Sequence, residues 1–367
     1  MGDRAIRLMV CGGGTGGHLF PGIAVAEAVL DRYPGSDVLF VGTGRHTDER
    51  VLANRRFKTV KISCQGLKGA TMRQKVFALL QAPLATISAM KLMRNFRPGL
   101  VIGVGGYVTG PVLLAAKLLG IATCIHEQNS VPGMANRQLG RFVDRIFLSI
   151  PGSEHYFGAK KCVLTGNPLR RELVAAAGQK KESGSGVTVL VLGGSLGAHR
   201  VNTLMAGAMT ILRKDLPENT LVIHQTGKDD EQMVRDAYRQ SGIKAEVASF
   251  FDDMGDLYGR ADLVVSRAGA TTLAEVTAFG LPMILIPYPF AADDHQRKNG
   301  EYLQRGGAAR MLRQEELTEQ QLAGEILSLL NDEARRRDMG AASKKFARPG
   351  ATAAIVDQCE MLMGLKA

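Results

Sequence analysis

Residues 7–30 read RLMVCGGGTGGHLFPGIAVAEAVL, and this stretch decides the fold. Its short apolar run, Leu8–Cys11, is typical of a buried parallel strand. Five glycines within residues 12–17 interrupt the run, and a helix is predicted over Gly22–Leu30. Glycine lets backbone amides approach a ligand closely, and a helix N-terminus adds a positive dipole end. A strand, a glycine turn and a helix in this order predict a Rossmann-like unit with an anion-binding loop.

The same turn matches the pattern GxGxxG at Gly12, Gly14 and Gly17, so a nicotinamide-dependent dehydrogenase is an alternative. That fingerprint also requires an acidic residue at the tip of the second strand, about 20 residues further on. The predicted second strand, Val38–Val41, runs instead into Gly-Thr-Gly and carries no carboxylate there. The missing acid argues against a dinucleotide cofactor. His18 is an ionisable side chain that directly follows this predicted anion-binding loop.

The overall composition limits the class of protein. A chain of 367 residues with 45% apolar content is expected to form two domains around large cores. No uninterrupted apolar segment of membrane-spanning length occurs, and the first residues lack a signal-peptide pattern, so we expect neither a membrane span nor a leader. Five cysteines without CxxC spacing are typical of reduced thiols in a cytosolic protein. We therefore expect no metal site.

Positive charge is concentrated in the first half. Residues 1–165 hold 21 Lys and Arg against 9 Asp and Glu, whereas the remainder holds 25 against 26. Residues 50–126 contain twelve Lys and Arg and not one Asp or Glu. Such a surface is expected to attract nucleic acid, a phosphorylated substrate or anionic lipid. A solvated basic face is the alternative, but the length of the acid-free stretch favours a functional role.

The segment Thr71–Phe96 has apolar residues on too many sides for a single buried stripe, and basic residues flank it. One interpretation is a core-packed helix kinked at Pro83. The other is an exposed apolar patch ringed by cations that lies on a membrane surface. Both interpretations can hold if one face of the helix packs on the core and another face lies on the membrane surface.

The opening pattern returns in the second half. Val187–Leu192 is a predicted strand, residues 193–197 are a glycine turn, and Val201–Leu212 is a predicted helix. The repeat predicts a second Rossmann-like domain. A third strand–turn–helix junction, at residues 263–275, places Glu275 one turn into its helix. Glu275 either binds vicinal hydroxyls or, as the simpler alternative, complements the helix dipole.

Polar residues follow two further predicted strands, at 126–129 and at 288–296. The C-terminal tips of parallel strands are where open α/β sheets bind ligands. We expect ligand contacts from both segments, although Asn129 could serve only as a turn residue.

Eight motifs in order resemble the bacterial peptidoglycan N-acetylglucosaminyltransferases that convert lipid I to lipid II. They are GGGTGGHLFPGIAVAE, GVGGYVTGP, HEQNSVPGMANR, TGNPLR, GGSLGA, HQTGK, SRAGATTLAE and PYPFAADDHQRKN. The resemblance implies the GT-B architecture, two Rossmann-like α/β domains with doubly wound parallel sheets facing across a cleft. The N-terminal acceptor domain would comprise residues 1–166 and 349–367, and the donor domain residues 167–348.

The resemblance also implies the reaction: inverting, metal-independent transfer of N-acetylglucosamine from UDP-N-acetylglucosamine. The acceptor would be the muramyl 4-hydroxyl of the undecaprenyl-diphosphate-linked muramyl-pentapeptide, lipid I. The partners implied are these two substrates and an anionic membrane surface, not nucleic acid, with no cofactor. The expected location is peripheral, on the cytoplasmic face of the inner membrane. The oligomeric state stays open.

Site residues follow from the matched motifs. Glu275 would hold the ribose hydroxyls, Phe251 would contact the uracil through its backbone, and Gln296 would orient the sugar, with His295 as a second candidate. Ser195 and the start of the helix at Ala270 would face the diphosphate. The full donor set implied is Thr15, Gly16, Gly17, Asn129, Arg170, Ser195, Phe251, Ala270, Thr271, Thr272, Leu273, Ala274, Glu275 and Gln296. The acceptor set is Gly13, Gly14, Gly105, Gly106 and Tyr107.

Sugar transfer needs a base for the acceptor hydroxyl and stabilisation of the departing UDP. Helix N-termini supply the second without a metal. His18 and Glu127 are the candidate bases, and we favour His18. The alternatives on the same fold are a UDP-N-acetylglucosamine epimerase or another lipid glycosyltransferase. A nucleotide-sugar-binding or membrane-docking subunit is the non-catalytic alternative.

Overall fold

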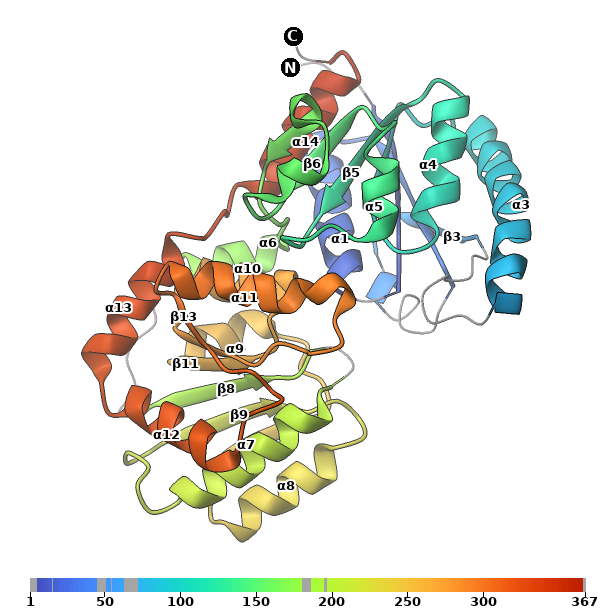
Figure 1. Cartoon of the computed structure of the whole chain (residues 1–367). Helices are drawn as coiled ribbons and strands as arrows, with labels where there is room; N and C mark the ends of the chain where they lie inside the picture. Colours follow the sequence, from blue (N-terminus) through green and yellow to red (C-terminus); the bar gives the residue numbers. More distant parts are fainter. Residues whose placement is uncertain are drawn as a thin grey trace. The chain divides into compact units, whose positions relative to one another are not determined.

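Figure 1 shows the computed structural model of the chain. It describes residues 5–14, 16–44, 51–53, 55–62, 72–179, 186–194 and 197–365, and the side chains within these ranges except those of residues 72–80. The chain divides into two compact units. Unit 1 comprises residues 1–170 and 349–367, and unit 2 comprises residues 171–348.

Unit 1 contains a seven-stranded parallel sheet among its described residues, in the order β3-β2-β1-β4-β5-β6-β7. The strands are β1 (Arg7–Gly12), β2 (Asp37–Gly42), β3 (Lys58–Lys61), β4 (Leu100–Gly105), β5 (Ala122–Glu127), β6 (Arg145–Leu148) and β7 (Cys162–Leu164). The helices are α1 (Gly16–Arg32), α3 (Met72–Phe96), α4 (Thr109–Leu118), α5 (Met134–Leu139) and α14 (Ala351–Leu362). Strand and helix alternate as predicted, which gives the doubly wound arrangement.

The side chains of β1 alternate between two apolar cores. Leu8 and Val10 pack with residues of α1 and α14, whereas Met9 and Cys11 pack with residues of α3 and α4. Successive residues of a strand point to opposite faces, so helices cover both faces of the sheet. Figure 1 shows α1 beside α14, and α3 beside α4.

One helix of unit 1, α1, differs from the predicted bounds. α1 begins at Gly16 and not at Gly22, because Pro21 removes only one backbone bond near the helix start while Leu19, Ile23 and Val25 are buried. α3 runs as one helix with Pro83 inside it. Thr71, the first residue of the predicted segment Thr71–Phe96, lies outside the described residues.

Unit 2 repeats the pattern with a six-stranded parallel sheet, again among described residues, in the order β10-β9-β8-β11-β12-β13. The strands are β8 (Thr188–Leu192), β9 (Leu221–Gln225), β10 (Ala245–Ala248), β11 (Leu263–Ser266), β12 (Met283–Leu285) and β13 (Ala309–Met311). The helices are α6 (Arg171–Ala177), α7 (His199–Leu212), α8 (Glu231–Gln240), α9 (Met254–Arg260), α10 (Ala270–Phe279), α11 (His295–Arg305), α12 (Glu319–Leu330) and α13 (Glu333–Lys344). Val189 and Val191 of β8 pack on one core, and Leu190 and Leu192 pack on the other.

The strand order reverses direction once in each sheet. In unit 1 this switch lies between β1 and β4, and in unit 2 between β8 and β11. Open parallel sheets bind ligands beyond the carboxyl ends of the strands at such a point. A ligand site is therefore expected in each unit at the turns that follow these strands.

Candidate active site

The two glycine turns of unit 1 pack backbone against backbone. The Gly13 N–H donates to the Gly105 carbonyl at 3.2 Å. A Cβ atom at Gly106, where φ is +89°, would lie 2.4 Å from the Gly13 oxygen. Only glycine allows this approach, which brings the loop after β1 and the loop after β4 together at the switch point.

His18 lies in the first turn of α1 and is held by Gln128, the residue that follows β5. The His18 Nδ1 is 3.2 Å from the Gln128 Oε1. The Gln128 Nε2 in turn is 2.8 Å from the Val104 carbonyl and 3.1 Å from the His126 Nδ1. The ends of β4 and β5 and the start of α1 thus meet around the Gln128 side chain.

His126 continues this network into the core. Its Nε2 lies 3.2 Å from the Gly166 carbonyl and 3.0 Å from the Ser149 hydroxyl. The side chain is completely buried, and this burial lowers the pKa of His126 to about 4. His126 is therefore neutral at physiological pH.

Glu127, the other candidate base, is also buried, and both of its carboxylate oxygens accept hydrogen bonds. Oε1 accepts from the Asn129 N–H at 2.9 Å and from its side-chain amide at 3.4 Å. Oε2 accepts from the Asn136 amide at 2.8 Å and from the Gly133 N–H at 3.3 Å. Burial raises the pKa of Glu127, and these hydrogen bonds oppose the rise. The carboxylate closes the loop from residue 128 to residue 136 and sets the position of Asn129.

The remaining predicted residues of unit 1 come from the start of α1, the turn before α4 and the segment after β7. Tyr107 is 40% exposed just before α4. Arg170 lies over the Phe20 ring of α1, with its guanidinium carbon 4.8 Å from the ring centre. Gly16 and Gly17 begin α1, and Gly14 has a φ of +101°. Thr15 lies outside the described residues.

In unit 2 the turn after β8 resembles that of unit 1. Gly194 and Gly197 have positive φ, and a Cβ atom at Gly197 would lie 2.4 Å from the Thr226 carbonyl. Ser195 lies outside the described residues. Across the switch point, α10 begins at Ala270 with Gly269 as its N-cap and without a side-chain cap. The start of this helix is suited to an anion, since its first amides point along the axis.

Two predicted donor residues are oriented by neighbours. The Tyr258 hydroxyl donates to the Glu275 Oε2 at 2.8 Å, and Glu275 is only 8% exposed. Glu275 is not in the first turn of α10, which contains no acidic residue, so complementing the dipole does not explain it. The Phe251 N–H donates to the Gln225 Oε1 at 3.1 Å.

The segment after β12 carries the third group of residues. Gln296 accepts a hydrogen bond from the Tyr288 N–H at 2.9 Å. Arg267 donates to the carbonyls of Ile286 and Pro287, and burial lowers the pKa of its guanidinium to about 10. Tyr288 and Phe290 form an edge-to-face pair, and Phe290 is 79% exposed. Arg267 thus anchors a turn that presents aromatic rings to solvent.

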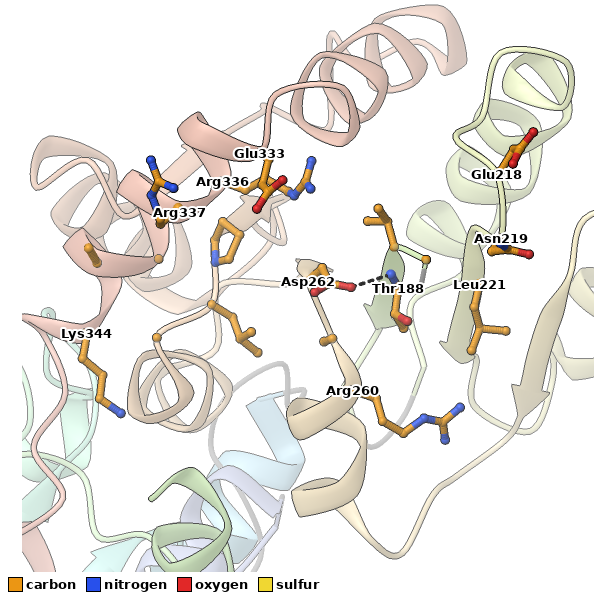
Figure 2. Close-up of a pocket in the computed structure, with 18 of the residues that line it drawn as sticks. Thr188, Glu218, Asn219, Leu221, Arg260, Asp262, Glu333, Arg336, Arg337 and Lys344 are labelled. Atoms are coloured by element: carbon orange, nitrogen blue, oxygen red, sulfur yellow. Dashed lines mark hydrogen bonds between the residues drawn. The ribbon is translucent and has the colours of Figure 1, made fainter. Parts of the chain in front are cut away.

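A cavity of about 1120 Å³ opens at the opposite end of the second sheet (Figure 2), beside the first residues of β8 and β9. Figure 2 shows the Thr188 N–H donating to Asp262 there, at 2.8 Å. Two of its cations already cap helices, since Arg336 donates to the last carbonyls of α12 and Lys344 donates to the Ala278 carbonyl. This end of a parallel sheet is not the ligand-binding end, so the cavity is not the candidate site.

Within the described ranges, no three His, Cys, Asp or Glu side chains are grouped as a metal site would need. No helix in those ranges is both long enough and apolar enough to cross a membrane.

The sequence matches two family models. Residues 8–148 match the glycosyltransferase family 28 N-terminal domain, and residues 188–354 match the corresponding C-terminal domain. A relative from Desulfotalea psychrophila is 48% identical over 98% of both chains, and one from Syntrophus aciditrophicus is 42% identical over 98% of this chain and 99% of its own. Both are named UDP-N-acetylglucosamine–N-acetylmuramyl-(pentapeptide) pyrophosphoryl-undecaprenol N-acetylglucosamine transferase.

The chain belongs to this transferase family.

Solved structures agree with this assignment. The crystal structure of MurG from Acinetobacter baumannii is 30% identical, with a TM-score of 0.78 over 97% of this chain and 99% of that one. A structure described as a UDP-N-acetylglucosamine 2-epimerase from Listeria monocytogenes has a TM-score of 0.71 at 15% identity, which shows a shared fold alone. The predicted GT-B architecture of this glycosyltransferase is confirmed.

Several residues that organise the site were missed from sequence. Gln128, His126 and Asn136 surround the two candidate bases, and Tyr258 and Gln225 orient the donor residues. The signal for the first two was a polar run at the tip of a buried strand. Nothing in the sequence pairs Tyr258 with Glu275, because they lie on different helices.

Proposed function

We propose that this transferase moves N-acetylglucosamine from UDP-N-acetylglucosamine to the 4-hydroxyl of lipid I, forming lipid II for peptidoglycan synthesis. The observation that carries the proposal is full-length similarity to transferases bearing that name, at 48% identity for one of them. The geometry of the two switch points supports the proposal, since each unit has a glycine turn suited to an anion and unit 1 has a histidine beside its turn.

His18 is proposed as the general base and Glu127 as a positioning residue. The His18 Nε2 takes the proton of the acceptor hydroxyl while that oxygen bonds to the anomeric carbon of the sugar. The bond from that carbon to the diphosphate breaks, and UDP leaves with the electron pair and with inversion at the carbon. Glu127 is unsuited to the proton transfer because four donors already occupy its carboxylate.

Unit 2 is proposed to bind the donor. Glu275 would accept hydrogen bonds from the two ribose hydroxyls, and the start of α10 would face the diphosphate. Gln225 supports this by holding the Phe251 backbone, where the uracil would bind. Helix dipoles and amides would stabilise the departing UDP, so we expect activity to persist in EDTA.

An anionic membrane surface is the proposed third partner. Leu84 and Ile87 of α3 are 65% and 50% exposed, and Leu118 of the adjoining α4 is 64% exposed. Exposed Lys91 and Arg94 follow on α3. Apolar residues next to cations on two neighbouring helices suit a peripheral position on anionic lipid, where lipid I would be presented.

The direct test is transfer of radiolabelled N-acetylglucosamine from its UDP conjugate to a short-chain lipid I analogue, with EDTA present. We expect a labelled disaccharide-lipid and one equivalent of UDP. Absence of labelled lipid under conditions where UDP-N-acetylglucosamine binds would contradict the proposal. Incubation with the donor alone separates the epimerase alternative, because an epimerase would convert the sugar without any acceptor.

A further inference from the structure

We propose that Gln128 is a positioning residue that fixes which ring nitrogen of His18 carries the proton, so that Nε2 is the proton acceptor. The inference rests on the proposed role of His18 and extends it to a side chain that does not touch the substrate. It follows from the chemistry of the groups around Gln128.

The first step is the orientation of the Gln128 amide. A backbone carbonyl can only accept a hydrogen bond, so the Gln128 atom 2.8 Å from the Val104 oxygen must be the nitrogen. The other amide hydrogen points to the His126 Nδ1 at 3.1 Å. Both donors of the amide are used, and its oxygen faces His18.

The second step concerns His18. The Gln128 Oε1 is an acceptor only, and it lies 3.2 Å from the His18 Nδ1. The Nδ1 must therefore be the protonated nitrogen of the neutral ring, which makes Nε2 the nitrogen with the lone pair. The ring also packs on Gly105, where a Cβ atom would lie 2.6 Å from Nδ1, so the contact depends on glycine at that position.

The Gln128 side-chain amide cannot flip to exchange its oxygen and nitrogen. If Gln128 flipped, its oxygen would face the Val104 carbonyl, and two acceptors would meet at hydrogen-bonding distance in a buried place. The hydrogen bonds of His126, at the other end of the network, also have fixed donors and acceptors. The His126 Nδ1 accepts, so its Nε2 donates to the Gly166 carbonyl, with the Ser149 hydroxyl as a second neighbour. His126 stays neutral because burial disfavours its protonated form.

The chain of bonds thus runs from the Gly166 carbonyl, near the end of the first segment of unit 1, to the proposed base. Gly166 belongs to the segment that leads out of β7, and it has a φ of +92°. The direction of every bond is set by carbonyl groups at Gly166 and Val104, which cannot reverse. Because the Gln128 amide is neutral, it fixes the tautomer of His18 without adding a charge of its own beside the ring.

The test is Gln128→Met, which keeps the length of the side chain and removes its polar atoms. We expect kcat to fall about 10–100-fold, as when a residue that orients a catalytic group is lost, with the KM for UDP-N-acetylglucosamine nearly unchanged. Ser149→Ala is the matched control, because it removes another neighbour of the network without altering its direction. Equal effects of the two variants would overturn the proposal.

The tautomer itself is measurable without activity. In the full chain labelled with ¹⁵N-histidine, the His18 signal is identified by its absence in His18→Gln. We expect the Nδ1–H form in the wild type and a shift towards Nε2–H in Gln128→Met. A wild-type ring in the Nε2–H form would overturn the proposal even if His18 proved to be the base. If the tautomer is as expected but His18→Gln retains full turnover, the role of His18 as base fails instead.

Discussion

At position 105, glycine is required for two separate reasons. Its φ of +111° strains any other residue, and a Cβ atom would overlap the His18 ring. The Thr109 hydroxyl donates to the Gly105 carbonyl at 2.9 Å, which holds the peptide in place. The position of one imidazole ring therefore depends on a residue with no side chain.

His18→Ala tests the base directly. We expect kcat to fall by about 10²–10⁴, because general-base catalysis by a positioned side chain contributes this much, while UDP affinity stays close to the wild type. Steady-state kinetics and calorimetric UDP binding are the measurements. His155→Ala, an exposed histidine of the same unit, is the control and should be nearly neutral. Near-normal turnover in His18→Ala would remove His18 from the mechanism.

Glu275→Gln tests the ribose assignment. Loss of the charged acceptor should weaken UDP binding by roughly 1.5–3 kcal/mol, or about 10–140-fold in Kd, measured by calorimetry. Glu333→Gln is the control, because Glu333 lies in the first turn of α13, where a carboxylate complements the helix dipole. An unchanged Kd for Glu275→Gln would refute the assignment of Glu275 to the ribose.

At the scale of elements, a buried histidine joins one strand to two helices in unit 2. His224 of β9 has its Nδ1 2.8 Å from the Tyr238 hydroxyl of α8 and its Nε2 3.0 Å from the Asn202 Oδ1 of α7. Asn202 also donates to the Thr226 carbonyl at 2.8 Å, beside the Gly197 turn. The network ties the packing of both helices to the shape of the proposed diphosphate loop.

This network makes stability depend on pH. Burial lowers the pKa of His224 to about 3, whereas an unfolded histidine titrates near 6.5. The unfolded state therefore binds more protons below pH 6.5, and stability is lost as the pH falls. Relative to the wild type, His224→Gln escapes this loss. We expect its destabilisation in urea unfolding to be about 1.4 kcal/mol smaller at pH 5.5 than at pH 8. An equal difference at both pH values would contradict the prediction.

At the scale of the whole molecule, the uneven charge of the sequence matches the different roles proposed for the two units. The basic first half folds into unit 1, which also carries the exposed residues Leu84, Ile87 and Leu118. The nearly neutral second half folds into unit 2, where the donor site is proposed. One unit is suited to a charged lipid surface and the other to a nucleotide in solution.

Vesicle co-sedimentation tests this division. Binding to vesicles with anionic lipid should decrease as salt is raised, and Leu84→Ser with Leu118→Ser should weaken it roughly 10-fold, because two apolar side chains lose their burial. Ile211→Ser, an exposed apolar residue of α7 in unit 2, is the control. Binding that ignores both anionic lipid and salt would contradict the membrane proposal.

The sequence predicted the repeated architecture because strand period, glycine turns and helix starts are local signals. It also placed His18 directly after the first glycine turn and Glu275 about one turn into its helix, as the structure has them. The sequence could not predict which side chains contact these residues, because Gln128 and His18 are 110 positions apart in the chain. The buried state of Glu127 was equally hidden, since a carboxylate at a strand tip has the same pattern whether it is exposed or saturated by donors. The early start of α1 could not be predicted because Gly16, Gly17 and Pro21 have low helix propensity.

The return of α14 to unit 1 has a consequence for synthesis. Ile355, Val356 and Cys359 are buried in the same core as β1, and Arg32 of α1 pairs with the buried Glu360. Domains generally fold in the order in which they leave the ribosome. Here the unit that is begun first is completed last, after the whole of unit 2 has been translated. A nascent chain that stops before residue 349 would hold a complete unit 2 and a unit 1 whose core still lacks α14.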